Sequence, residues 1–378
     1  MKQIILYAIL SLLFLSCGNV KNKVGKNADE LLILKFEDQS LSSLFSNRIF
    51  GKMEMTPLET DEKCLVGAYP ELLADDRHFF ITDRQQHVVF RFDRAGKFIN
   101  QIGKRGRGPG EYSGILDFDV DAEANVVEIL VSGGQIMRYN YDGTFVSNQK
   151  YDIKYLHSFI KTGADYWFNI GATKFSEDGH LLKVSEDGTV IEKFLPVKTD
   201  WEIPFGDRSF SRCGDMISFK EVFSNTVHRI TDNGPIETTV IDFGRYAIPK
   251  NSYERDLTDV VYELEKKGWA VLYRYYENDQ FVYICFRVQQ NDKSIGNYHW
   301  LVNKKTGNSV LQKVLPDDPL FDMMEEAKIL TAENELVFMA NAQMLKECTD
   351  PFFNTVNISN GTLSESNPII VSLKINDF

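Results

Sequence analysis

Apolar and polar residues alternate along short stretches of the chain, and a turn containing glycine separates each stretch from the next. The clearest copy occupies residues 88–99 around Gly96, and a second occupies residues 136–146 around Gly143. Alternation with a period of two predicts a half-buried strand, and a glycine turn between two such strands predicts a hairpin. Each glycine is therefore expected at the positive φ of a turn, with no ligand of its own.

The same pattern recurs at six places along the chain. Its turn glycines are Gly96, Gly143, Gly188, Gly234, Gly307 and Gly361. The first four are spaced by about 45 residues, the period of a four-stranded propeller blade whose innermost strand lines a central channel. We therefore predict an all-β fold, a six-bladed β-propeller over residues 31–378. A strand within residues 49–58 is expected to close the ring in the last blade, beside residues 368–375.

A longer step separates the fourth glycine from the fifth, and residues 251–268 between them carry a helical pattern. Asn251 or Ser252 can cap this helix, and Gly268 can end it. Its apolar face contains Tyr253, Leu257, Val260, Val261 and Leu264, and its solvent side contains Glu254, Arg255, Asp256 and Asp259. We expect one helix inserted between blades four and five, where it either contributes to a recognition surface or only covers the rim.

The chain begins with an apolar stretch at residues 4–15, which is too short to span a bilayer of ~30 Å. It predicts a signal peptide over residues 1–16. The segment Phe14-Leu15-Ser16-Cys17 is similar to a lipobox, which makes Cys17 the lipidated first residue of the mature chain. An ordinary signal peptide with an incidental cysteine is the alternative. Residues 17–30 are polar and predict a flexible tether.

Composition fits a globular protein with a sizeable core, because 43% of the residues are hydrophobic and 25% are charged. The formal net charge is −12, and loss of Lys2 with the signal peptide makes the mature chain about one unit more negative. A general nucleic-acid binder is therefore not expected. The cysteines after Cys17 lack C-x-x-C spacing, although one pair could be oxidised in an exported protein. They are Cys64, Cys213, Cys285 and Cys348.

Two patterns that could carry chemistry have structural explanations. The glycine-rich run at residues 103–110 lacks the ending of a phosphate-binding loop, so we expect a linker between blades with Lys104, Arg105 and Arg107 in solvent. Only His157 among the histidines is placed to face the channel, so we expect no metal and no cofactor. The others are His78, His87, His180, His228 and His299. A carboxylate pair for glycoside hydrolysis stays open, because distance in space defines it.

A mouth of the channel is the expected place for a ligand, if the ring binds one. The candidates that the innermost strands offer there are His157, Arg208, Arg212, Tyr273, Arg274 and Tyr275. Successive side chains of a strand point to opposite faces, so only about half of these can face the channel.

The sequence resembles the six-bladed β-propeller lipoproteins of Bacteroidota-type bacteria, which are related to NHL-type propellers. The resemblance covers most of the chain from about residue 55 onward. Its most specific segments are Thr56-Pro57-Leu58-Glu59-Thr60, Phe80-Ile81-Thr82-Asp83, Phe92-Asp93-Arg94-Ala95-Gly96-Lys97-Phe98 and residues 102–112. The resemblance implies the propeller fold and export, and it provides no catalytic residue for this chain.

In that family, acidic residues directly after the lipidated cysteine favour display on the cell surface. This tether instead carries Lys21, Lys23 and Lys26. We therefore expect a lipoprotein of the cell envelope that faces the periplasm.

Fold alone assigns no activity to the chain. We predict a lipid-anchored module that binds a ligand or another protein, with a glycan, a peptide or an envelope protein as partner and only the lipid in the membrane. The alternative is a propeller hydrolase or lyase that acts on a glycan or a peptide. Converging histidines or paired carboxylates at a channel mouth would favour that alternative.

Overall fold

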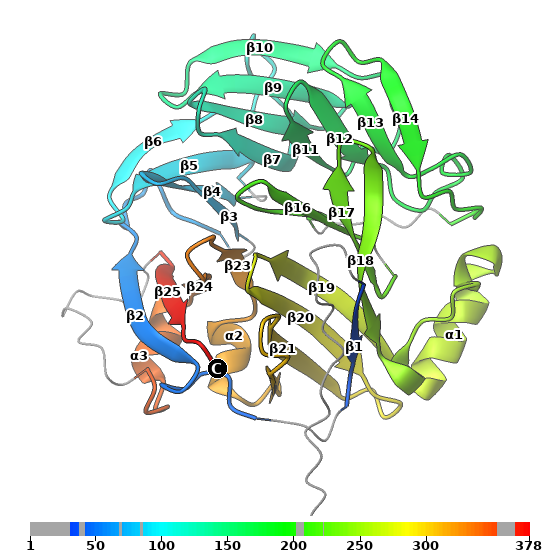
Figure 1. Cartoon of the computed structure of the whole chain (residues 1–378). Coiled ribbons are helices and arrows are strands. Elements are labelled where there is room, and N and C mark those ends of the chain that lie inside the picture. The colour runs from blue at the N-terminus through cyan, green and yellow to red at the C-terminus, as the bar shows by residue number, and fades with distance from the viewer. Residues whose placement is uncertain are drawn as a thin grey trace, which may run out of the picture.

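The computed structural model describes residues 31–37, 42–67, 70–83, 86–201, 208–221, 223–353 and 367–378. These residues form six β-sheets around a central axis, as Figure 1 shows. The predicted all-β, six-bladed propeller is therefore confirmed. The predicted signal peptide, Cys17 and the tether lie outside the described residues, and so does Gly361.

We number the blades from the sheet that closes the ring, and each blade is given from its innermost strand outward. Blade 1 contains β23 (Ala327–Leu330), β24 (Glu335–Ala340), β25 (Ile369–Ile375) and β2 (Phe50–Pro57). Blade 2 contains β3 (Pro70–Ala74), β4 (His78–Asp83), β5 (Val88–Asp93) and β6 (Phe98–Ile102). Blade 3 contains β7 (Ile115–Asp121), β8 (Val126–Val131), β9 (Gln135–Asn140) and β10 (Phe145–Lys150).

The remaining blades follow the same order. Blade 4 contains β11 (Ser158–Thr162), β12 (Asp165–Asn169), β13 (Leu181–Ser185) and β14 (Val190–Phe194). Blade 5 contains β15 (Phe210–Cys213), β16 (Met216–Lys220), β17 (Thr226–Thr231) and β18 (Gly234–Asp242), with β1 (Leu32–Lys35) parallel to β18 at its outer edge. Blade 6 contains β19 (Trp269–Glu277), β20 (Phe281–Gln289), β21 (Ile295–Asn303) and β22 (Ser309–Val314).

The ring is closed by strand β2, which pairs antiparallel with β25 from the other end of the chain. Met55 of β2 lies opposite Val371 of β25, and the pairing extends from Phe50 to Pro57. The prediction that a strand within residues 49–58 joins the last blade is therefore confirmed. This closure places a completed sheet between blades 2 and 6, so the ring has no gap between its two ends.

Glycines in the hairpins between the third and fourth strands of blades 2 to 6 have positive φ, as predicted. They are Gly96, Gly143, Gly188, Gly234 and Gly307. Gly96 meets a second constraint, because a Cβ there would lie 2.1 Å from the carbonyl oxygen of Pro57 at the end of β2. The hairpin of blade 2 therefore packs directly against the closing strand.

Neighbouring blades stack face to face, and the hydrophobic core lies between them. Phe80 and Val89 of blade 2, for example, belong to one cluster with Phe118 and Val127 of blade 3. A middle strand is covered on both faces, so it loses the alternation of a half-exposed strand. Strand β20 shows the effect, with seven of its nine residues buried.

The inserted helix is α1 (Leu257–Lys267), which begins after Asp256. The Asp256 side chain accepts hydrogen bonds from the backbone N–H groups of Thr258 and Asp259, at 2.8 and 3.3 Å. The predicted caps Asn251 and Ser252 are wrong, because a 3-10 turn, η2 (Ser252–Glu254), follows Asn251 and begins at Ser252, ahead of the helix. Gly268 follows the helix with φ of 82°, as predicted.

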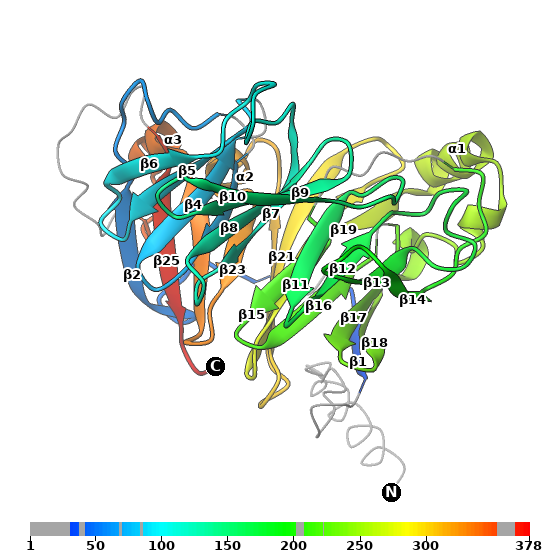
Figure 2. The ribbon, with the colours of Figure 1, turned by 90° about the horizontal axis from the view of Figure 1, so that it is seen from above.

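Helix α1 lies at the outer rim of the ring in both views (Figures 1 and 2). In the chain it falls between β18 and β19, which are strands of blades 5 and 6. The sequence predicts this helix between blades four and five, when blades are counted from the glycine repeats with the closing sheet last. In the present count the closing sheet comes first, because it contains β2, so each blade number is one higher.

One face of α1 packs against the rim, where Val260 and Leu264 form a small cluster with Trp201. Val261, predicted on the same face, is 44% exposed, and Tyr262 beside it is 61% exposed. The helix therefore covers the rim and also presents apolar surface to solvent.

The other helical segments are short. They are η1 (Gly244–Tyr246), α2 (Pro319–Met323) and α3 (Ala342–Glu347). No helix in the described part of the chain has the length and apolar character needed to cross a bilayer.

We expect Gly96→Ala to destabilise the protein more than Gly163→Ala, because only the first adds a clash with the closing strand. Both glycines have positive φ, of 83° and 58°, but nothing lies within 4 Å of a Cβ at Gly163. Gly163→Ala should cost about 1–2 kcal/mol for its backbone conformation alone, and Gly96→Ala at least ~1 kcal/mol more. Urea denaturation of both variants measures the difference; equal losses would contradict the packing of this hairpin on β2.

Candidate functional site at the ring axis

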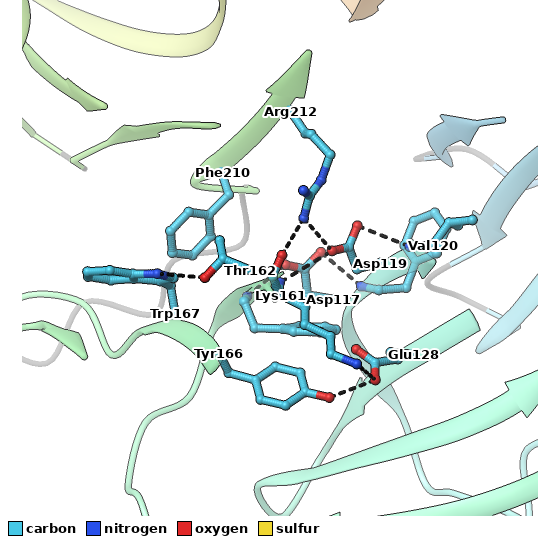
Figure 3. Close-up of polar contacts among 12 residues, drawn as sticks. Asp117, Asp119, Val120, Glu128, Lys161, Thr162, Tyr166, Trp167, Phe210 and Arg212 are labelled. Carbon is cyan, nitrogen blue, oxygen red and sulfur yellow. Dashed lines mark hydrogen bonds and ion pairs between the residues drawn. The ribbon is translucent and has the colours of Figure 1, made fainter. Parts of the chain in front are cut away.

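Strand β7 presents two carboxylates to the next innermost strand. Asp117 and Asp119 are two residues apart, so strand geometry places them on one face. Asp117 Oδ2 accepts the backbone N–H of Phe159 at 3.0 Å, and Asp119 Oδ2 accepts that of Lys161 at 3.4 Å. Figure 3 shows these side chains between the two strands. The carboxylates thus join β7 to β11, two innermost strands that belong to different sheets.

Two arginines from blade 5 meet the same carboxylates. Arg208 lies two residues before β15, and its guanidinium is 3.6 Å from Asp117 Oδ1 and 3.7 Å from Asp119 Oδ1. It also donates to the carbonyl oxygen of Phe118 at 2.9 Å. Arg212 on β15 lies 3.3 Å from Asp119 Oδ2 and donates to the carbonyl oxygen of Lys161 at 2.6 Å (Figure 3). Asp119 therefore lies between two guanidinium groups.

A second cluster joins blades 6, 1 and 2. Arg274 on β19 contacts Glu71 of β3 at 2.6 Å and Glu326, directly before β23, at 2.5 Å. Lys328 on β23 lies 2.8 Å from Glu326. One guanidinium thus holds two carboxylates that come from two other blades.

Burial and pairing oppose each other at these groups. Burial alone would lower the pKa of Arg274, but the charges of Glu326 and Glu71 outweigh it and raise that pKa. Burial likewise favours a raised pKa for Glu326, yet Arg274 and Lys328 hold that pKa below its usual value. Both groups are therefore charged at neutral pH.

The charges at the axis balance. The carboxylates are Glu71, Asp117, Asp119 and Glu326, and the cations are Arg208, Arg212, Arg274 and Lys328. We call these eight residues the axial network. All of them lie on an innermost strand or within two residues of one. The axial network consists of two clusters, of which the first joins blades 3 and 5 and, through Asp117 and Asp119, the backbone of blade 4, and the second joins blades 1, 2 and 6.

A neighbouring polar cluster extends from the axis into blades 3 and 4. Glu128 of β8 is buried, and its Oε1 accepts from Arg138 Nε at 2.7 Å and from the Tyr166 hydroxyl at 2.6 Å. Lys161 Nζ lies 3.7 Å from the same oxygen (Figure 3). This carboxylate therefore also ties two blades together.

The structure brings three of the predicted site residues to the axis and separates the others. Arg208, Arg212 and Arg274 belong to the axial network. The Tyr275 hydroxyl instead lies between blades 5 and 6, at 2.8 Å from Thr239 Oγ1 and 2.9 Å from Glu277 Oε2. The remaining two also have local contacts: the Tyr273 ring lies under the Arg287 guanidinium at 4.9 Å, and the backbone N–H of His157 donates to the Asn169 carbonyl oxygen at 3.0 Å.

Sequence reasoning missed the four axial carboxylates, because distance in space defines such a group. A signal existed for Asp117 and Asp119, whose spacing of two on a predicted innermost strand places both on one face. Glu71 and Glu326 carried no comparable signal, since their shared partner Arg274 is 203 and 52 residues away.

Metal-binding and redox groups are dispersed. Within the described ranges, no three or more His, Cys, Asp and Glu side chains lie together as metal ligands. His228 and His299 lie on third strands of their blades, and both are buried, as is His180. The four cysteines of the described part are free thiols.

Comparison with known proteins gives a family and a fold. The family described as "Domain of unknown function (DUF4934)" matches residues 33–374. A Bacteroides fragilis protein described as exported has a TM-score of 0.70 at 18% identity, over 91% of this chain and 99% of its own. A member of the DUF4221 family from Bacteroides vulgatus has a TM-score of 0.56 at 11% identity, over 88% and 99%. At these identities the structural likeness shows the shared fold. No curated protein matches the sequence significantly.

We expect Arg274→Met to destabilise the protein by about 3–5 kcal/mol, because it leaves two buried carboxylates without their partner. Lys193→Met is the control, since Lys193 pairs with Asp178 at an exposed position and should contribute under ~1 kcal/mol. Adding Glu71→Gln and Glu326→Gln to Arg274→Met should recover part of the loss, which thermal and urea unfolding can measure. A loss of equal size in both single variants would show that the axial network does not stabilise the ring.

Three buried histidines should make the protein sensitive to acid. Burial lowers the pKa of His180, His228 and His299 from 6.5 to about 4. Between pH 4 and pH 6.5 these histidines bind protons in the unfolded chain but not in the folded chain. Their contribution to the free energy of unfolding is therefore fully present above pH 6.5 and decreases towards pH 4. Burial raises the pKa of Glu221 from 4.5 to about 7. The protonated carboxyl therefore stabilises the folded state at low pH, and this stabilisation is lost as the pH rises from 4.5 through 7.

Three protons from the histidines outweigh one from the carboxyl, so the free energy of unfolding should fall as pH decreases from 6.5 to 4.5. Urea denaturation at a series of pH values measures this slope, and His228→Asn should reduce it. An unchanged slope in that variant would contradict a lowered pKa for His228.

Proposed function

The chain belongs to the DUF4934 family, and from its charge-balanced axis we propose that it is an exported, lipid-anchored binding protein of the cell envelope. In this proposal the ring is a rigid scaffold, and a partner contacts its outer surface. The partner would be a glycan, a peptide or an envelope protein, and each of these would bind the outer surface of the ring. We favour a protein partner at α1.

The axial network is the observation that supports a scaffold at the axis rather than a catalytic site. A catalytic acid or base must come within hydrogen-bond reach of a substrate proton, and a nucleophile must reach the atom to which it bonds. Each charged side chain of the axial network instead has an ion partner inside the ring, and removal of one partner leaves a buried charge. These residues therefore serve the scaffold.

One axial residue, Arg212, keeps a mouth of the channel as a second place where a ligand would bind. Arg212 has a side chain that is 38% exposed, whereas the side chains of Arg208 and Arg274 are 8% and 6% exposed. Of the three axial arginines, Arg212 is thus the one that a ligand can reach without opening the network.

Helix α1 supports a protein partner. Tyr262 and Val261 project from it into solvent, and an open pocket lies between the helix and the rim, lined by Trp201, Phe223 and Trp269. Aromatic side chains that are exposed beside an apolar pocket are typical of protein interfaces. Substitution of the charged residues near the start of the helix would not test partner binding alone, because Asp256 caps α1 and Arg255 pairs with Glu263 at 2.8 Å.

The lipid anchor is proposed at Cys17, on the basis of the segment that is similar to a lipobox. Strand β1 begins at Leu32 at the outer edge of blade 5, so the tether would join the ring at its rim. An anchor at the rim leaves both faces of the ring available to a partner.

Mass spectrometry of the mature protein should find acylated Cys17 as its first residue, and Cys17→Ala should release the protein from the membrane fraction. The reason is that a single, short apolar stretch is removed with the signal peptide. A mature chain that starts elsewhere, or a Cys17→Ala variant that stays in the membrane, would refute the anchor.

A photo-crosslinking amino acid at position 262 of the full chain should give one defined adduct with an envelope protein in intact cells. The same amino acid at exposed position 192 on β14 is the control and should not give that adduct. Identical adducts at both positions, or none at position 262, would contradict α1 as the recognition surface. Turnover of a glycan or peptide by the purified chain would favour the hydrolase or lyase instead.

A further inference from the structure

The glycine-rich run between blades 2 and 3 folds into a compact loop over residues 103–112. The Gly106 N–H donates to the Tyr112 carbonyl at 2.9 Å, and the Tyr112 N–H donates to the Lys104 carbonyl at 3.1 Å. Glu111 Oε2 accepts the Gly108 N–H at 2.8 Å. The loop is therefore ordered by its own hydrogen bonds, and a ligand would not need to order it.

Glycine is required in this loop because the chain approaches its neighbours closely. A Cβ at Gly110, which has φ of 72°, would lie 2.9 Å from the Phe145 ring of β10. A Cβ at Gly106 would lie 1.9 Å from the Glu111 carboxylate. These glycines let the loop fold beside the outer strands of blade 3, β9 and β10, which Figure 1 places at the periphery of the ring.

A groove of about 450 Å³ lies between the loop and these strands. That volume is within the range of roughly 300–1,000 Å³ found for small-molecule sites. Phe145 is 37% exposed at the groove, and Val131 and Met137 supply further apolar lining. The groove thus offers one exposed aromatic ring, whereas Val131 and Met137 are themselves buried.

Two amides add polar groups to this lining. Asn148 Nδ2 donates to Gln135 Oε1 at 3.0 Å, which leaves the Asn148 oxygen and the Gln135 nitrogen for a ligand. If the oxygen and nitrogen positions of both amides are exchanged, one acceptor and one donor still remain. A ligand with hydroxyl groups satisfies such a pair, because a hydroxyl both donates and accepts.

Three cationic residues belong to the loop whose Gly106 and Gly108 line the groove. Lys104, Arg105 and Arg107 are all exposed, as predicted, within a chain whose net charge is −12. Lys104 lies 3.6 Å from Glu111, the one acidic residue that lines the groove. Arg105 and Arg107 have no ion pair with any described residue. A guanidinium of this kind binds carboxylate or sulfate oxygens through paired hydrogen bonds.

We propose that this groove, which nothing in the argument for α1 requires, binds an acidic oligosaccharide. The apolar face of a sugar ring would contact Phe145, its hydroxyl groups would pair with Gln135 and Asn148, and its carboxylate or sulfate would meet Arg105 and Arg107. The amide and aromatic lining and the cations of the loop together define this class: the lining selects a hydroxylated ring, and Arg105 and Arg107 select negative charge, while Lys104 offsets the charge of Glu111.

Isothermal titration of the full mature chain in detergent tests the proposal with four probes at low and physiological salt. The probes are a tetragalacturonate, a chondroitin sulfate tetrasaccharide, the neutral cellotetraose and a tetraglutamate peptide. We expect at least one acidic oligosaccharide to bind about 10-fold or more tightly than cellotetraose, and to weaken as salt increases. The two acidic sugars distinguish a carboxylate from a sulfate as the recognised group.

Variants of the groove then assign the site. Arg105→Ala with Arg107→Ala should weaken that binding about 10-fold or more, and Gln135→Ala should weaken cellotetraose and the acidic sugar alike. Lys266→Ala with Lys305→Ala removes the same charge on blade 6 and α1 and should leave the affinity unchanged. Unchanged melting temperatures show that the exposed variants remain folded.

Three results would overturn the proposal. They are no binding of either acidic oligosaccharide, equal losses in the groove and control variants, and tighter binding of the tetraglutamate peptide than of both sugars. The last result would identify an acidic peptide as the ligand of the groove. None of them bears on α1, so the proposed protein interface would stand or fall separately.

Discussion

Pairing of β2 with β25 is the constraint on which the rest of the structure depends. A propeller blade buries its faces only against its neighbours, so an open series of blades would expose two apolar faces and two unpaired edges. The closing pair brings the first and last described thirds of the chain into one sheet. It thereby fixes how many innermost strands surround the axis, and every side chain on them must then fit a space of defined size.

Charged side chains fill that space in pairs. Burial of an ion costs several kcal/mol, and a partner repays this only with good geometry. Asp117 and Asp119 gain such geometry because they bind backbone N–H groups as well as guanidinium groups, as Asp117 does with Phe159 and Arg208. Neighbouring blades share no ladder of backbone hydrogen bonds, so these side chains set the register of one innermost strand against the next. The hydrophobic clusters between blades hold the sheets together but do not specify this register as strictly.

Local patterns predicted what local residues determine. Turn glycines such as Gly143 revealed the hairpins, and the closing strand followed from the count of repeats. The cap of α1 was misplaced because Asn251 and Asp256 are both good caps, and packing of the rim decides between them. Tyr275 was assigned to the channel together with Arg274, although strand alternation allows only one of two successive residues to face it. A register shift between Leu272 and Arg274 sets which one does, and no sequence pattern announces it.

The contrast between the buried axis and the exposed rim explains where this ring can recognise a ligand. Any change at the axis removes a partner from a buried charge and costs several kcal/mol, whereas an exposed substitution at the rim usually changes stability by under ~0.5 kcal/mol. The axis is therefore tied to the fold, and the rim is free to vary in chemistry. Helix α1 on blades 5 and 6 and the groove on blade 3 are both additions to the rim, and each is ordered by its own contacts rather than by the axial network. Because they share no residue, a partner at one can be changed without altering the other or the ring that carries them.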